Sequence, residues 1–206
     1  MNLPNALTIT RIFLVPLLVV VLLTQFEGRN ILGVAPEIVG AAIFGLPPEV
    51  VGAAIFGIAS LTDWADGYLA RRRKQITPLG QVIDPLADKL LTAAALIALL
   101  QMDMVSAWVV AIIIGRELAI TGLRSLAYAR NIAMPASRLG KVKMVGEVVA
   151  ILALILAHGN IPFADTLDVI GQVALWFVVV TALISAADYF RRFSDLDKVD
   201  YRRKTA

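Results

Sequence analysis

Aspartates recur at short spacing between Asp63 and Asp88. Asp63 and Asp66 are three residues apart, and Asp84 and Asp88 are four apart, so each pair projects from one face of a helix. Clustered carboxylates repel one another unless cations hold them, and a donor set of oxygen atoms alone favours Mg²⁺ or Mn²⁺ over Zn²⁺. The chain has no cysteine and a single histidine, His158. We therefore predict a divalent-metal site formed by Asp63, Asp66, Asp84 and Asp88.

Small and basic residues share a helical face with the first aspartate pair. Gly67, Ala70 and Arg71 follow Asp63 at helical spacing. Gly67 exposes backbone to a ligand, Ala70 leaves space for a flat group, and Arg71 offers a planar set of donors suited to phosphate oxygens. A glycine in a membrane helix can equally serve close helix packing, and that alternative stays open for Gly67 taken alone. Metal ligands, a groove and an arginine together predict a site for a nucleoside diphosphate group.

Some basic residues lie well inside the apolar segments of the chain. Arg116 lies in the segment GRELAITGLRS with Glu117 beside it. Arg124 follows at the end of the same apolar segment, and Lys141 and Lys143 lie at the start of the next one. A buried ion pair of Arg116 with Glu117 or Glu147 is one interpretation. The other is an anion pocket for a phosphorylated acceptor, formed by Arg116, Arg124, Lys141 and Lys143.

The composition indicates which elements position these residues. The chain is 59% hydrophobic with a mean hydropathy of +0.79, and we expect each of its apolar runs to reach the roughly 20 residues that cross a bilayer. We predict an all-α integral membrane protein forming a single domain over residues 1–206. The predicted bundle has about six transmembrane helices, at Leu3–Leu23, Glu49–Leu69, Val82–Leu100, Val105–Leu126, Val142–Ala157 and Leu167–Ala187.

The basic residues predict the orientation of the bundle. Lys and Arg are enriched in cytoplasmic loops, and the segments Arg71–Lys74, Arg124–Lys143 and Arg191–Lys204 share one side of the predicted topology, with Arg29 on the other. Both termini are then cytoplasmic, and the aspartates lie at the cytoplasmic ends of the second and third helices. A short chain with a basic tail suits the inner (cytoplasmic) membrane of a bacterium.

The aspartate segment resembles the signature of the CDP-alcohol phosphotransferases, D-x2-D-G-x2-A-R-x8-G-x3-D-x3-D. The match is without a gap and covers Asp63, Asp66, Gly67, Ala70, Arg71, Gly80, Asp84 and Asp88. Such a signature is far more specific than a lone glycine motif. The resemblance implies transfer of a phosphatidyl group from CDP-diacylglycerol to an alcohol, with CMP leaving. It also implies a homodimer within the membrane lipids, and nothing in the sequence predicts a nucleic-acid partner.

The resemblance also implies roles for individual residues. Asp63, Asp66 and Asp84 would hold one metal ion, Asp63, Asp84 and Asp88 a second, and Asp88 would be the general base. Gly67 and Arg71 would hold the diphosphate. The segment from Asn5 to Thr8 resembles the part of the first helix that contacts the cytidine nucleotide, although Asn5 could equally cap that helix. Thr77 occupies a position that the family uses near the nucleotide.

The alcohol that accepts the phosphatidyl group is predicted from two segments shorter than the aspartate signature. The GRE and GKVK segments, which contain Arg116 and Lys143, resemble those of the phosphatidylglycerophosphate synthase branch, whose acceptor is glycerol 3-phosphate. Inositol phosphate and phosphatidylglycerol remain alternative acceptors. A divalent cation transporter is the alternative outside enzymes, but a conduction path needs polar groups through the depth of the bilayer, whereas the aspartates cluster at one end.

A tandem repeat has no predicted function. PEIVGAAIFG at Pro36–Gly45 recurs as PEVVGAAIFG at Pro48–Gly57. Two copies with this short period are too few and too short for a solenoid, so local duplication is the interpretation. The second copy leads into the aspartate helix, and we expect the first to be a re-entrant or interfacial extracytoplasmic segment.

Overall fold

The computed structural model describes the backbone of residues 3–27, 47–73, 78–129, 138–159 and 162–205. Within these helices, it does not describe the side chains of residues 3–9, 24–27, 48, 63–73, 78–85, 128–129, 138–141 and 192–205. Every regular element in the described ranges is an α-helix, which confirms the predicted fold class at the level of secondary structure.

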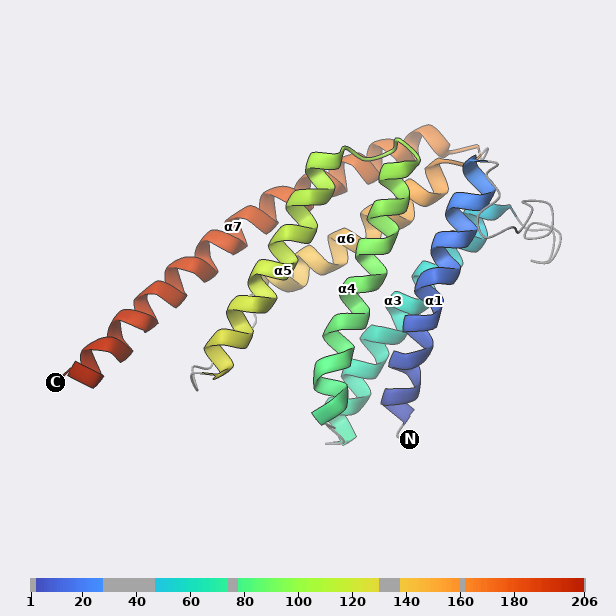
Figure 1. Ribbon diagram of the computed structural model, residues 1–206. Helices are drawn as coiled ribbons and strands as arrows, with labels where there is room; N and C mark the ends of the chain where they lie inside the picture. Colours follow the sequence, from blue (N-terminus) through green and yellow to red (C-terminus); the bar gives the residue numbers. More distant parts are fainter. Residues whose placement is uncertain (1–2, 28–46, 74–77, 130–137, 160–161, 206) are drawn as a thin grey trace.

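The described helices form a bundle that runs up and down (Figure 1). They are α1 (Leu3–Glu27), α3 (Pro48–Arg73), α4 (Pro78–Gln101), α5 (Ala107–Ala129), α6 (Arg138–Ala157) and α7 (Ala164–Thr205). Each of the predicted apolar intervals overlaps one of these helices. The start of α1, the end of α3 and the start of α4 lie together at the lower end of the view, and α5 and α7 also end on that side.

Apolar length differs among the helices. Within the described residues, Ala164–Arg191 alone is both long and apolar enough to cross a membrane by itself, with a mean hydropathy of 2.2. Shorter apolar stretches are Thr10–Leu23 in α1 and Glu49–Thr62 in α3. Helix α7 then continues to Thr205, well beyond the apolar interval predicted for it. At 1.5 Å per residue it is about 60 Å long, roughly twice the thickness of a bilayer's hydrocarbon core.

The starts of α4 and α6 differ most from the sequence prediction. Helix α4 begins at Pro78 and not near Val82. Proline is well tolerated in a first turn, because its missing N–H would have no partner inside the helix there. Helix α6 begins at Arg138, before the predicted Val142, so that Lys141 and Lys143 lie within its first two turns. An apolar run marks the lipid-compatible part of a helix, whereas the backbone hydrogen bonding continues into polar sequence.

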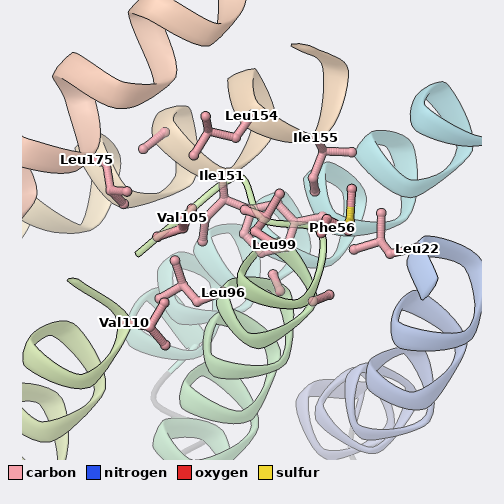
Figure 2. Packing of buried hydrophobic residues seen from close by; sticks show 14 of the residues in the cluster. Leu22, Phe56, Leu96, Leu99, Val105, Val110, Ile151, Leu154, Ile155 and Leu175 are labelled. Atoms are coloured by element: carbon pink, nitrogen blue, oxygen red, sulfur yellow. The ribbon is translucent and has the colours of Figure 1, made fainter. Parts of the chain in front are cut away.

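One continuous apolar core holds most of the bundle together. It includes Leu22 of α1, Phe56 of α3, Leu99 of α4, Ile155 of α6 and Leu175 of α7, all almost fully buried. Figure 2 shows these side chains converging from the different helices. They come from the end of each helix that lies away from the α3–α4 connection. The helices are therefore fixed at that end, while polar residues gather toward the other.

Glycines allow the closest helix contacts. A Cβ atom on Gly171 of α7 would lie 2.6 Å from Leu154 Cγ of α6, and one on Gly52 of α3 would lie 2.7 Å from Leu22 Cδ2 of α1. Such distances are far below van der Waals contact, so a side chain at either position would force its neighbour to move. At Gly171 the Leu154 backbone nitrogen also lies 3.2 Å from the added Cβ atom, so the two helices themselves would have to shift. Gly52 belongs to the second copy of the tandem repeat, which thus serves helix packing. The first copy, Pro36–Gly45, lies outside the described residues.

Candidate active site

The hairpin of α3 and α4 places the predicted aspartates at one end of the bundle. Asp63 and Asp66 lie in the second half of α3, and Asp84 and Asp88 lie in the first half of α4. The two helices contact each other and are joined by only the short segment 74–77, so both aspartate pairs flank the same connection (Figure 1). The two pairs therefore lie on consecutive helices, on either side of one connection.

The donor chemistry of this hairpin fits a hard divalent cation. It offers carboxylates, and the chain has no cysteine. His158 directly follows the far end of α6, where its backbone N–H donates a hydrogen bond to the Leu154 carbonyl. Carboxylate oxygens without soft ligands favour Mg²⁺ or Mn²⁺. No group of three or more potential ligands occurs among the described side chains, which do not include those of Asp63, Asp66 and Asp84.

Asp88 is the one predicted metal ligand whose side chain is described. It is half-buried, and its backbone carbonyl accepts a hydrogen bond of 3.1 Å from Thr92 Oγ1 one turn later. Its carboxylate lies close enough to that of Glu147 on α6 for the two to repel each other. Asp88 therefore links the aspartate hairpin to the polar residues of α6.

A cluster of ion pairs joins α4, α5 and α6 beside Asp88. Glu117 of α5 accepts hydrogen bonds from Lys89 at Oε2 and from Lys143 at Oε1. Arg116 Nη1 lies 2.5 Å from the same Oε1 atom. Lys143 also pairs with Glu147 at 3.1 Å, and its side chain is only 3% exposed. We name Lys89, Arg116, Glu117, Lys143 and Glu147 the charged cluster. It contains the pairing of Arg116 with Glu117 that the sequence left as one of two interpretations.

The charged cluster extends to α7 through Arg116. Arg116 Nη2 donates a hydrogen bond of 2.7 Å to Ser185 Oγ, and Ser185 is almost fully buried. The Nε atom of Arg116 is buried and has no hydrogen-bond partner among the described residues. Buried polar atoms are nearly always partnered, so this N–H can still take an acceptor.

The remaining predicted site residues occupy several helices. The structure brings Arg116 and Lys143 together, while Arg124 lies on the exposed surface of α5, two turns from Arg116. Lys141 belongs to α6, but its side chain is not described. Residues whose backbone alone is described are Asn5 and Thr8 in α1 and Gly67, Ala70 and Arg71 in α3; Thr77 lies outside the described residues.

Sequence reasoning missed two members of this arrangement. Lys89 directly follows Asp88, and a lysine at the start of an apolar helical run was the available signal for it. Ser185 carried no such signal, because single serines are common in apolar helices.

Known proteins resemble this chain over nearly its whole length. The model of the CDP-alcohol phosphatidyltransferase family matches residues 1–184. The CDP-diacylglycerol--glycerol-3-phosphate 3-phosphatidyltransferase of Bacillus subtilis (strain 168) is 41% identical over 192 residues, which cover 93% of this chain and 94% of that protein. The protein of the same name from Pseudomonas fluorescens is 30% identical over 99% of this chain and 96% of its own length.

A third relative is matched over a smaller share of its own length. The probable phosphatidylglycerophosphate synthase of Mycobacterium tuberculosis (strain ATCC 25618 / H37Rv) is 36% identical over 93% of this chain and 81% of its own length. The family match and these identities confirm the resemblance carried by the aspartate signature. The chain belongs to the CDP-alcohol phosphatidyltransferase family, whose members are membrane-embedded enzymes that depend on divalent metal.

Proposed function

We propose that this protein transfers a phosphatidyl group from CDP-diacylglycerol to glycerol 3-phosphate, giving phosphatidylglycerophosphate and CMP in phospholipid biosynthesis. The observation that carries this proposal is the near full-length identity to relatives whose names state that activity, up to 41% over 192 residues. The ungapped aspartate signature on the α3–α4 hairpin supports it.

In the proposed site, the hairpin holds two divalent metal ions. Asp63, Asp66 and Asp84 are the ligands of one ion, and Asp63, Asp84 and Asp88 are those of the other. When bound, Mg²⁺ or Mn²⁺ supplies stabilisation of the negative charge that develops on the diphosphate. The carboxylate-only donor set of the hairpin supports this assignment.

Asp88 is the proposed general base. It takes the proton from the glycerol hydroxyl as that oxygen attacks the lipid-linked phosphorus of CDP-diacylglycerol. The bond from this phosphorus to the oxygen of CMP breaks, and CMP carries away the displaced charge. The reaction needs no covalent enzyme intermediate. The position of Asp88 between Asp84, the other aspartate of α4, and the charged cluster supports this role.

The two substrates occupy opposite sides of the aspartates in this proposal. CDP-diacylglycerol binds along α1, α3 and their neighbours, through Asn5, Thr8, Gly67, Ala70, Arg71 and Thr77. The acceptor phosphate binds Arg116, Arg124, Lys141 and Lys143. The unpartnered Nε of Arg116 and the proximity of Arg116 to Lys143 at Glu117 support the acceptor pocket.

We further propose a membrane topology for the chain as a single domain over residues 1–206. All of α1, α3, α4, α5, α6 and α7 cross the inner (cytoplasmic) membrane, both termini are cytoplasmic, and the active site faces the cytoplasm. The alternation of the helices in Figure 1 and the basic residues near the shared end support this topology. The protein acts as a homodimer in this proposal, as the family resemblance implies.

The test is CMP release by the purified protein in detergent, with CDP-diacylglycerol, Mg²⁺ and one acceptor at a time. Glycerol 3-phosphate, inositol phosphate and phosphatidylglycerol are compared. The proposal predicts release that depends on glycerol 3-phosphate. Release with another acceptor alone would keep the chemistry and reject the proposed acceptor.

A further inference from the structure

The carboxylate of Glu117 forms ion pairs with basic side chains from three helices. Oε2 accepts from Lys89 of α4, while Oε1 accepts from Lys143 of α6 and Arg116 of its own helix α5. Both carboxylate oxygens are therefore occupied. The side chain of Glu117 is 18% exposed and that of Lys143 is 3% exposed, so these pairs are poorly screened by water.

The ion pairs of the charged cluster join three cations to two carboxylates. In the part of the chain that the structure describes, Lys89, Arg116 and Lys143 pair with Glu117 and Glu147, and the carboxylate of Asp88 lies near that of Glu147. Among the described residues, the Lys89 ammonium donates to Glu117 alone, which leaves two of its three N–H groups for another acceptor. Its side chain is 23% exposed, the most accessible of the charged cluster. Cationic groups with spare N–H donors fit an anion such as phosphate.

Lys89 also lies next to the proposed general base, Asp88. It is the residue after Asp88, on the helix that carries the second aspartate pair. A group bound by Lys89 and Lys143 would lie between α4 and α6, next to the proposed general base. Arg116 Nε, buried and unpartnered among the described residues, offers a further donor from α5.

We infer that Lys89 binds the acceptor phosphate and that Glu117 is a positioning residue which holds Lys89 and Lys143 together for that purpose. The inference rests on the proposed function, to which it adds a phosphate-binding residue and the carboxylate that orients it. Like charges brought together repel, and Glu117 offsets this repulsion before the acceptor arrives. The pocket is thereby preorganised, so that less of the binding free energy is spent on ordering its side chains.

The expected effects of substitutions at Glu117 depend on the hydrogen bonds that its two carboxylate oxygens accept. Glu117→Gln keeps one acceptor oxygen and replaces the other with an NH₂ group, which cannot accept a hydrogen bond from an ammonium group. Either Lys89 or the pair of Arg116 and Lys143 must then lose its contact. Glu117→Asp keeps both oxygens on a shorter side chain. We expect KM for glycerol 3-phosphate to rise about ten-fold in Glu117→Gln, the scale of one charge-assisted hydrogen bond, and less in Glu117→Asp.

Substitutions at Lys89 test the same pocket without removing its central carboxylate. Lys89→Gln is expected to raise KM for glycerol 3-phosphate about ten-fold or more, and Lys89→Arg, which keeps the charge, is expected to restore most of the affinity. KM for CDP-diacylglycerol should stay within about two-fold of wild type, because one substrate alone loses a contact. Arg191→Gln removes a charge from the exposed surface of α7 and is the matched control.

A binding measurement complements the kinetics. Glycerol 3-phosphate should raise the unfolding temperature of the wild-type protein, since a ligand stabilises the state that it binds, and should raise that of Lys89→Gln less at the same concentration. If Glu117 only locked the helices together, its variants would unfold at lower temperature and both KM values would change together. That result, or an unchanged KM for glycerol 3-phosphate in Lys89→Gln, would overturn the inference.

Failure of the inference is distinct from failure of the proposed function. In the first case, the wild-type protein releases CMP with glycerol 3-phosphate and the variants at Lys89 and Glu117 retain its affinity. In the second, the wild-type protein itself shows no release that depends on this acceptor, and the inference falls with the function.

Discussion

Ser185 of α7 accepts a hydrogen bond of 2.7 Å from Arg116 Nη2 of α5, and the two residues are 69 positions apart in sequence. This contact anchors the guanidinium group that also pairs with Glu117. Helix α7, the longest of the described helices, is thereby linked to the charged cluster by a side-chain hydrogen bond. A small apolar cluster of Ile120, Leu123 and Tyr189 joins the same two helices.

Loss of the Ser185 hydroxyl should destabilise the protein measurably. Ser185→Ala leaves Arg116 Nη2 buried without this acceptor, and hydrogen bonds to charged groups contribute about 1.5 kcal/mol or more. We expect a lower midpoint of thermal unfolding in detergent. Thr181→Val is the matched control, because the Thr181 hydroxyl bonds the Phe177 carbonyl within α7 itself, at 2.9 Å. Equal losses in the two variants would contradict a special contribution of the interhelical bond.

The contact of α6 with α7 should tolerate no side chain at Gly171. Gly171→Ala would place a Cβ atom 2.6 Å from Leu154 Cγ and 3.2 Å from the Leu154 backbone nitrogen. Overpacking of this kind costs about 2 kcal/mol, so we expect a lower unfolding temperature. Gly122→Ala on α5 is the control, since its Cβ would meet nothing within 4 Å. It should stabilise the helix by about 0.5 kcal/mol, because alanine loses less backbone entropy. A Gly171→Ala protein as stable as wild type would show that α7 does not pack on α6 in this way.

The proposed orientation can be tested at the two ends of α5. The chain has no cysteine, so a single introduced thiol is labelled without background. Ser106 precedes α5 and Ser125 lies near its end, and both are exposed. Nineteen residues of helix span about 28 Å, close to the thickness of the hydrocarbon core. We expect a membrane-impermeant maleimide to label Ser106→Cys in intact cells and Ser125→Cys only after permeabilisation. Labelling of both from outside would contradict a crossing by α5, and the reverse pattern would invert the topology.

The helices could be predicted from the sequence, but the side-chain contacts between them could not. Apolar runs and the aspartate spacing were sufficient to predict each helix and the end of the bundle where Asp63 and Asp88 lie. The pairing of Lys89 with Glu117 joins residues 28 positions apart, and it depends on how α4 and α5 are rotated about their axes. Helical periodicity gives the faces of one helix but not which neighbour each face meets. Ser185 was missed because a single serine in an apolar helix carries no signal of its partner.

Asp88 should differ from the other aspartates in its response to metal. Asp88→Asn removes the proposed base, and we expect kcat to fall at least about 100-fold without recovery at saturating Mg²⁺. Asp66→Asn removes a ligand of one proposed ion, so raised Mg²⁺ should restore part of its rate. Chelation of the metal from the wild-type protein should abolish CMP release, and added Mg²⁺ or Mn²⁺ should restore it. If Asp88→Asn regains the wild-type rate at high Mg²⁺, Asp88 is a metal ligand and not the base.

The most direct test of the central claim follows the acceptor into the lipid product. Purified wild-type protein is incubated with CDP-diacylglycerol, Mg²⁺ and radiolabelled glycerol 3-phosphate, and the label that enters the lipid phase is measured beside the CMP released. The account predicts one labelled phosphatidylglycerophosphate for each CMP, and a loss of both products in Asp88→Asn. CMP release from folded wild-type protein with no label in the lipid phase would contradict it.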